Sequence, residues 1–222
     1  MGKMNDDFET VAALASTIKG FLAGDEGRAL YEMAMAASKL GPCLEIGSFC
    51  GKSTVYLGAA CKNNDSTLFT IDHHRGSEEQ QPGQPYFDPD IFDSLKGEVN
   101  SLPLLRETLK KAGLEDNVVP MVTRSGAAAR NWATPLGLVF IDGGHSYETA
   151  LADYRGWSPH LLPGGLLIFH DIYSDPAKGG QAPWEVYKLA LKSGNYGELP
   201  MVNSLGILRR LPAVVVEKKV CC

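Results

Sequence analysis

Short apolar segments alternate with helical segments along most of the chain, and no other feature limits the possible folds as much. Five apolar segments span residues 43–46, 67–71, 118–122, 136–141 and 166–169, and most of them are nearly unbroken, as strands buried on both faces must be. Apolar residues at helical spacing lie between them, at residues 52–62, 102–112, 125–131 and 147–157. This order predicts a doubly wound α/β fold, a mostly parallel sheet with helices on both faces.

Further elements are predicted at the two ends of the chain. Residues 1–40 are expected to form an N-terminal helical extension, whose second helix covers residues 25–40. A last helix is predicted at 183–193, and two strands at 197–202 and 205–210 are close enough in sequence to form a hairpin.

Prolines and glycines mark the breaks between these elements. Pro120 makes the third strand the weakest strand prediction, because proline cannot donate a hydrogen bond to a neighbouring strand. Pro163-Gly164-Gly165 is predicted to be a tight turn before the fifth strand. The polar segment from His73 to Asp90 is long for a loop and contains three prolines. Such a loop is typical of a lid or a binding loop, and a solvated surface excursion is the alternative.

Length and composition indicate one globular domain with additions. We place the main domain at 41–211 and a tail at 212–222 of the 222 residues. The net charge of −5 disfavours nucleic acid as a partner, because duplex-binding domains carry a basic surface. No apolar run approaches the length of a membrane span, and the N-terminus is unlike a signal peptide. An odd number of cysteines without a CxxC pair favours a reducing, cytoplasmic setting; they are Cys43, Cys50, Cys61, Cys221 and Cys222.

Two features at the ends of the first two strands indicate a nucleoside ligand. Gly47 and Gly51 lie in a glycine-rich turn that opens the next helix, where a ligand can approach the backbone. The spacing matches neither G-x-G-x-x-G nor a phosphate loop, and a plain tight turn is the alternative. Asp72 ends the second strand, where a carboxylate can accept hydrogen bonds from ribose hydroxyls. An ordinary loop aspartate is the alternative for that residue.

The segment from Leu44 to Ser53, with its E-x-G-x-x-C-G-x-S string, resembles the first motif of class I S-adenosylmethionine-dependent methyltransferases, especially the catechol O-methyltransferase branch. The stretch Ile141-Asp142-Gly143 with His145 and Tyr147 is similar to one in bacterial methyltransferases of sugars and secondary metabolites. The resemblance covers roughly residues 40–172. It implies a Rossmann-like, seven-stranded sheet whose last strand runs antiparallel.

The resemblance also implies S-adenosylmethionine as the cofactor and gives the matching residues their roles. Gly47 and Phe49 would line its methionine end, and Ser53 would contact its carboxylate. Asp72 would bind the ribose, and Ser125 would lie near the adenine. Glu45 would help to hold the methionine amino group through water, and Gly51 and Asp142 complete the expected cofactor-binding set.

Asp142, His170 and Asp171 are candidate ligands of a divalent metal, because the strands that they follow end at the ligand-binding edge of such a sheet. Two carboxylates suit Mg²⁺, whereas the imidazole favours Mn²⁺ or a related ion. The catechol-type enzymes have an Asp-Asn pair at the last position, and here Ile172 takes the place of the asparagine. Strand alternation would point His170 away from the site, so a site without metal is the alternative.

His145 is the candidate general base. It lies three residues after Asp142, where the catechol-type enzymes have a lysine that acts as the base, and a histidine titrates near neutral pH. We therefore expect His145 and Asp142 to be catalytic. A role for His145 as a metal ligand or as a helix cap stays open.

The sequence thus predicts an enzyme that transfers a methyl group from S-adenosylmethionine to a hydroxyl of a small molecule. The acceptor would be a sugar, a phenol or a secondary metabolite, with a metal as a possible aid. A cofactor-binding protein without activity and a nucleotide-dependent oxidoreductase are the alternatives. The two N-terminal helices would cover the acceptor site or form a contact in a homo-oligomer.

Overall fold

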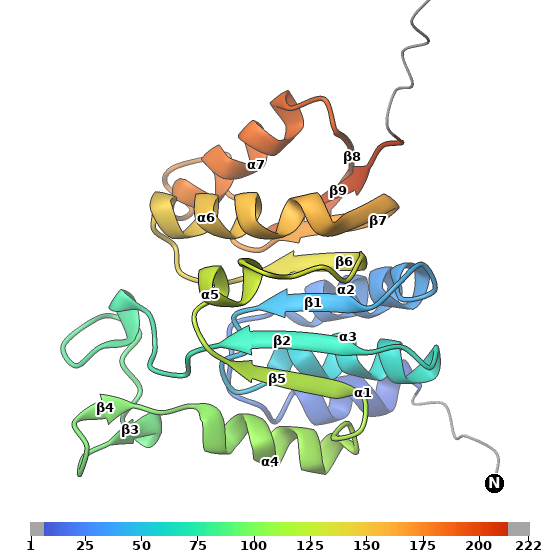
Figure 1. Cartoon of the computed structure of the whole chain (residues 1–222). Coiled ribbons are helices and arrows are strands. Elements are labelled where there is room, and N and C mark those ends of the chain that lie inside the picture. The colour runs from blue at the N-terminus through green and yellow to red at the C-terminus, as the bar shows by residue number, and fades with distance from the viewer. Residues whose placement is uncertain (1–6, 213–222) are drawn as a thin grey trace, which may run out of the picture.

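The computed structural model describes residues 7–212, and a seven-stranded sheet lies at its centre (Figure 1). The strands follow the order β5-β2-β1-β6-β7-β9-β8. Neighbours among the first five run parallel, whereas β9 runs antiparallel to both β7 and β8. The predicted Rossmann-like sheet with an antiparallel last strand is therefore confirmed. The strands are β1 (Cys43–Ile46), β2 (Leu68–Asp72), β5 (Val118–Val122), β6 (Leu136–Ile141), β7 (Leu161–Phe169), β8 (Tyr196–Val202) and β9 (Leu205–Arg210).

Helices cover both faces of this sheet, because alternate residues of its buried strands are apolar on either side. Leu138 and Phe140 of β6 pack toward α1 to α4, whereas Val139 and Ile141 pack toward α5 to α7. The helices are α1 (Phe8–Ala15), α2 (Gly24–Ala37), α3 (Lys52–Asn63), α4 (Leu102–Ala112), α5 (Ser125–Ala129), α6 (Tyr147–Trp157) and α7 (Ala182–Lys192). None of the helices between residues 7 and 212 is both long and apolar enough for a membrane span.

The N-terminal helices share their apolar core with the sheet. Val11 and Leu30 belong to the same buried cluster as Leu57 of α3 and Phe140 of β6. Gly27 lets α2 approach α3 closely, since a Cβ atom there would lie 2.4 Å from the ring of Tyr56. The division of the chain at residues 40 and 211 stays a prediction. Residues 213–222, with Cys221 and Cys222, lie outside the described part of the chain.

Several predicted boundaries were wrong. The second helix ends at Ala37, before residue 40, and the helix predicted at 125–131 ends at Ala129. Pro163-Gly164-Gly165 lies inside β7, and no turn separates it from the strand. The register between β6 and β7 shifts after Leu136, so that the additional residues of β7 bulge out of the ladder. Pro120 is tolerated in β5 because β5 is an edge strand.

The segment after β2 extends beyond the carboxyl ends of the strands (Figure 1). It contains two short 3₁₀ helices, Glu78–Gln80 and Pro89–Ile91, and a small hairpin of β3 (Phe92–Asp93) and β4 (Glu98–Val99) that the sequence analysis did not anticipate. Lys19, between α1 and α2, ties the segment down, because its Nζ donates to Asp88 at 2.6 Å and to Asp90 at 2.7 Å. The lid role of this segment stays a prediction.

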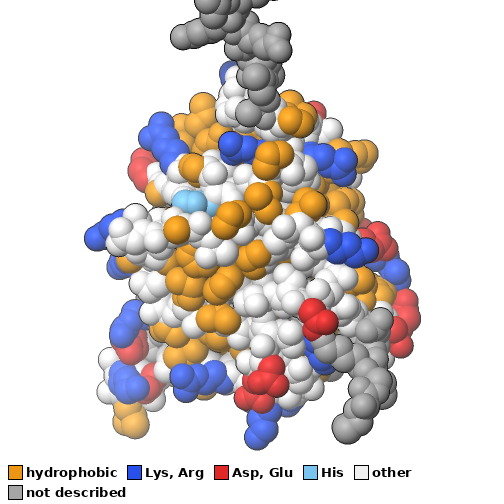
Figure 2. Space-filling view, turned by 45° about the vertical axis from the view of Figure 1, so that its right-hand side comes forward, with side chains coloured by type: hydrophobic (Ala, Val, Ile, Leu, Met, Phe, Trp, Pro, Cys, Tyr) orange, Lys and Arg blue, Asp and Glu red, His pale blue; other side chains and the backbone are white. Residues whose placement is uncertain are grey.

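Figure 2 brings forward the edge of the sheet at which the parallel strands begin, which is opposite to the edge formed by their carboxyl ends. Basic and acidic side chains are interspersed there around apolar ones.

The cysteines of the described chain, Cys43, Cys50 and Cys61, are buried free thiols.

Candidate active site

A cavity of about 1630 Å³ opens at the carboxyl ends of the parallel strands. The strand order reverses at β1, which is where open α/β sheets bind their ligands. Usual small-molecule pockets hold roughly 300–1,000 Å³, so this cavity has room for a cofactor and an acceptor together. The predicted residues that line it are Gly47, Phe49, Ser53, Asp72, Ser125, Asp142, His145, His170 and Asp171. Glu45 and Gly51 lie outside its lining.

Gly47 directly follows β1 and lies against the residue that follows β6. Its φ of +94° is unfavourable for other residues, and a Cβ atom there would lie 2.0 Å from the carbonyl oxygen of Asp142. Gly51 also has a positive φ, but its Cβ would meet Thr108 of α4, at 2.9 Å. The two glycines of the motif therefore serve different contacts. Gly47 shapes the cavity, and Gly51 lets α3 pack closely against α4.

Replacing Gly47 by alanine should lower the free energy of unfolding by about 2–5 kcal/mol, since backbone strain and overlap with the Asp142 carbonyl add. Urea unfolding measures this loss. Gly126→Ala is the matched control, because no atom lies within 4 Å of a Cβ at that helical glycine. The control should change stability by less than about 1 kcal/mol. Equal stabilities of the two variants would contradict the close approach of β1 and β6.

Asp72 joins the glycine-rich turn to the end of β2. Its Oδ2 accepts a hydrogen bond from the backbone N–H of Phe49 at 2.8 Å, and its Oδ1 accepts one from that of His74 at 2.7 Å. Each carboxylate oxygen has a further lone pair, so the side chain can still accept hydrogen bonds from two hydroxyls. Next to it, the buried hydroxyl of Ser48 lines the cavity and has no hydrogen-bond partner among the described residues. A buried polar atom of this kind fits a cavity that receives a polar ligand.

Glu45 is fully buried beneath this turn. Its carboxylate accepts hydrogen bonds of 2.6 Å from the hydroxyls of Ser53, Thr54 and Thr70. Burial nevertheless raises the pKa of Glu45 to about 7. The structure therefore places Glu45 behind Ser53, a residue that lines the cavity and whose hydroxyl donates its proton to Glu45.

The raised pKa of Glu45 predicts a dependence of stability on pH. Between its ordinary value of 4.5 and about 7, the folded state keeps a proton that the unfolded chain has lost. The free energy of unfolding should therefore fall with rising pH across this window, by about 3 kcal/mol at most, and be level above it. Urea unfolding of Glu45→Gln and the parent protein at pH 5 and pH 8 isolates this contribution. Parallel pH profiles of the two proteins would contradict the raised pKa.

The end of the cavity next to the edge strand β5 contains Ser125, at the start of α5. Its Oγ accepts a hydrogen bond of 2.7 Å from Nε1 of Trp157. Asp153 of α6 also lines this end, and burial raises its pKa to about 6 while a hydrogen bond with Ser125 opposes the rise. Asp153 is not among the site residues predicted from the sequence. The sequence feature that could have identified it is an aspartate at an inward-facing position of an amphipathic helix.

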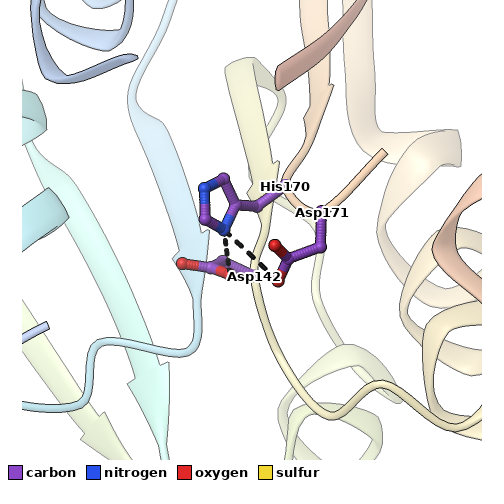
Figure 3. Close-up of side chains that lie close together, drawn as sticks. All are labelled: Asp142, His170 and Asp171. Atoms are coloured by element: carbon purple, nitrogen blue, oxygen red, sulfur yellow. Dashed lines mark hydrogen bonds and ion pairs between the residues drawn. The ribbon is translucent and has the colours of Figure 1, made fainter. Parts of the chain in front are cut away.

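The three candidate metal ligands converge, as Figure 3 shows. Each offers one ligand atom, and these atoms of Asp142, His170 and Asp171 lie within 4.8 Å of one another. Nδ1 of His170 is 3.1 Å from Oδ1 of Asp142 and 3.5 Å from Oδ2 of Asp171. The expectation that strand alternation points His170 away was wrong. Phe169, the last residue of β7, packs toward α5 to α7, so alternation places His170 on the other face, beside Phe140 and Glu26. The left-handed backbone of Asp171, with φ +57°, then brings its carboxylate to the same place.

His145 lies between two carboxylates. Its Nε2 is 2.9 Å from Oδ2 of Asp171, and its Nδ1 is 3.0 Å from Oε2 of Glu79 in the segment after β2. The hydrogen bond with Asp171, together with that from Glu79, raises the pKa of His145 to about 9. The ring therefore carries a proton at neutral pH in this arrangement.

Sequence reasoning missed Glu79, and it missed Glu26 of α2, whose Oε2 lies 3.2 Å from Nε2 of His170. Both come from segments far away in the sequence. The site is therefore a chain of alternating carboxylates and imidazoles along one side of the cavity. The carboxylates outnumber the imidazoles, which favours a bound cation.

Comparisons with known proteins agree with this geometry. A sequence profile for a family described as a methyltransferase domain matches residues 44–172. The solved O-methyltransferase NovP is 15% identical, with a TM-score of 0.62 over 84% of this chain and 81% of that chain. The O-methyltransferase TomG from Streptomyces achromogenes, involved in tomaymycin synthesis and solved with SAM, is 15% identical, with a TM-score of 0.63 over 94% and 92%. An O-methyltransferase from Bacillus cereus, solved with SAH, is 16% identical, with a TM-score of 0.60 over 91% and 88%.

At these identities the solved structures show a shared fold. The profile match is what establishes the family, because residues 44–172 make up more than half of the 222 residues. The resemblance inferred from the segment Leu44 to Ser53 is thereby confirmed, and the chain belongs to the methyltransferase domain family.

Proposed function

We propose that the protein transfers the methyl group of S-adenosylmethionine to a hydroxyl of a small molecule. The observation that carries this proposal is that one cavity contains both halves of the required chemistry. Asp72, Ser48 and Ser125 present hydrogen-bonding groups along one part of its wall, and Asp142, His145 and Asp171 form an ionisable cluster in another. The solved relatives with SAM or SAH and with O-methyltransferase activity support the same assignment.

The cofactor would lie along the carboxyl ends of β1 and β2. In this arrangement the ribose hydroxyls donate to Asp72, the methionine end lies against Gly47 and Phe49, and the adenine lies near Ser125. The orphaned hydroxyl of Ser48 fits such a polar ligand. Glu45 acts through Ser53, since its carboxylate is buried behind that hydroxyl.

The donor set of Asp142, Asp171 and His170 fits a divalent cation. A carboxylate pair with one imidazole nitrogen suits Mn²⁺ better than Mg²⁺. A cation bound there would lower the pKa of an acceptor hydroxyl and fix its position. The acidic surroundings of Asp142, Asp171, Glu26 and Glu79 would stabilise both this cation and the positive sulfonium of the cofactor.

The protein's own contribution to the reaction is orientation and proton transfer. Orientation of the acceptor oxygen in line with the methyl group can supply about 7–11 kcal/mol in well-aligned cases. His145 is held at Nε2 by Asp171, so its Nδ1 is the atom that would receive the hydroxyl proton. Glu79 occupies Nδ1 in the described arrangement, and the ring is protonated there, so Nδ1 can receive the hydroxyl proton only after the acceptor has displaced Glu79 and the ring has released its Nδ1 proton to solvent.

The test combines binding and turnover. Isothermal titration calorimetry with S-adenosylhomocysteine, with and without Mn²⁺ or Mg²⁺, should show binding, and a library of sugars and phenols should reveal a methylated hydroxyl. Titration with NAD(H) is the comparison, and tighter binding of NAD(H) than of S-adenosylhomocysteine would overturn the proposal. The homo-oligomer, the cytoplasmic location and the absence of nucleic-acid partners stay predictions from the sequence.

A further inference from the structure

Glu26 is a buried carboxylate that helix α2 brings to the edge of the cavity. Its side chain is 4% exposed, yet both oxygens have hydrogen-bond donors. Oε2 accepts hydrogen bonds from the backbone N–H of Ala23 at 3.0 Å and from Nε2 of His170 at 3.2 Å. Oε1 accepts from the backbone N–H of Ser204 at 3.0 Å and from its hydroxyl at 2.7 Å. A carboxylate with four donors is rigidly placed.

The position of α2 makes this contact possible. Gly27 follows Glu26 and allows α2 to pack directly on the ring of Tyr56. Asp25 of the same turn accepts a hydrogen bond of 2.6 Å from Nδ2 of Asn203. The first turn of α2 is thus joined to the β8–β9 turn on one side and to the end of β7 on the other.

His170 faces a carboxylate at each ring nitrogen. Nε2 faces Glu26, and Nδ1 faces Asp142 and Asp171. Burial alone would raise the pKa of Glu26, but the hydrogen bonds from His170, Ala23 and Ser204 outweigh burial and lower the pKa to about 2. Backbone N–H groups, which can only donate, face both oxygens of Glu26, so the carboxylate accepts on each side and Nε2 of His170 is the donor in their contact.

We propose that Glu26 is the positioning residue of His170: it holds the Nε2–H and thereby keeps Nδ1 directed at Asp142 and Asp171. A carboxylate behind the distal nitrogen is the arrangement that orients metal-bound histidines in proteins. The orientation itself follows from the contacts of Glu26. The further step, that the oriented Nδ1 atom of His170 helps to hold a divalent cation, rests on the proposed function. The N-terminal extension is in this view part of the active site.

Glu26→Gln is the test variant. A glutamine has one oxygen and one NH₂ group, and backbone N–H donors face both positions, from Ala23 and from Ser204. Neither orientation of the amide can satisfy both donors. With the NH₂ group toward His170 the hold is lost, and with the oxygen there the hold is weakened, because a neutral amide accepts more weakly than a carboxylate. Asp25→Asn is the matched control, because Asp25 lies in the same turn and contacts the same β8–β9 turn without touching His170. Glu26→Asp, which keeps the charge but is one methylene shorter, serves if Glu26→Gln does not fold.

Two readouts are compared among these variants. Nitrogen-15 NMR of the imidazole should show a slowly exchanging Nε2–H for His170 in the parent protein and in Asp25→Asn, and its loss in Glu26→Gln. Calorimetry with Mn²⁺ should show an affinity about 10–100-fold lower in Glu26→Gln than in Asp25→Asn. A folded Glu26→Gln protein with parent-like ring signals of His170 would overturn the proposal. A parent protein that binds no Mn²⁺ would overturn the cation site of the proposed function, while the ring signals would still decide the role of Glu26.

Discussion

Replacing Asp72 by alanine is expected to weaken the binding of S-adenosylhomocysteine about 100-fold. Two hydrogen bonds from ribose hydroxyls to an ionised carboxylate would be lost, at about 1.5–3 kcal/mol each, and part of this loss would be recovered by water. The variant also removes the acceptor of the Phe49 and His74 backbone N–H groups. Both residues have a left-handed backbone, with φ of +46° and +58°, so the turns that they form depend on this carboxylate.

Calorimetric titration of the purified variant measures this effect. Asp116→Ala is the control, because Asp116 is exposed and lies outside the cavity lining. The control should keep the parent dissociation constant and the parent melting temperature. If Asp72→Ala is folded and binds S-adenosylhomocysteine as tightly as Asp116→Ala does, the ribose contact is wrong.

The strands of the sheet could be predicted because each strand is specified by its own short stretch of sequence. Each parallel strand contains a short apolar run, and the predicted bounds of the runs at 43–46, 118–122 and 136–141 match those of the structure. One rule then locates the site, since ligands bind at the carboxyl ends of strands where the strand order reverses. Asp72 and Asp142 follow directly from that rule, and both line the cavity.

The carboxylates that orient the histidines could not be predicted, because their partners lie far away in the sequence. Glu26 and His170 are separated by 144 residues, and Glu79 and His145 by 66. Apolar periodicity places a helix on a sheet, but it does not say which turn of that helix reaches a strand end. The error at Pro163-Gly164-Gly165 has a related cause. These residues are typical of a turn, but β7 contains them as a bulge where its register against β6 shifts. The bulge depends on how the two strands pair, and local sequence does not show that pairing.

Replacing His145 by alanine is expected to lower the turnover of the methylated acceptor about 10²–10⁴-fold, which is the usual contribution of a general base. The affinity for S-adenosylhomocysteine should change little, because the side-chain contacts of His145 are to Asp171 and Glu79 and not to the groups assigned to the cofactor. Steady-state rates measured with a saturating acceptor, together with calorimetry, separate the two quantities. His160→Ala is the matched control, since His160 packs on Trp157 outside the cavity lining and its loss should leave turnover unchanged. A parent-like rate in His145→Ala would remove the base assignment. The proton would then have to leave through another group of the cluster, and Asp142 is the residue to replace next, because burial raises its pKa despite the opposing charge of His170.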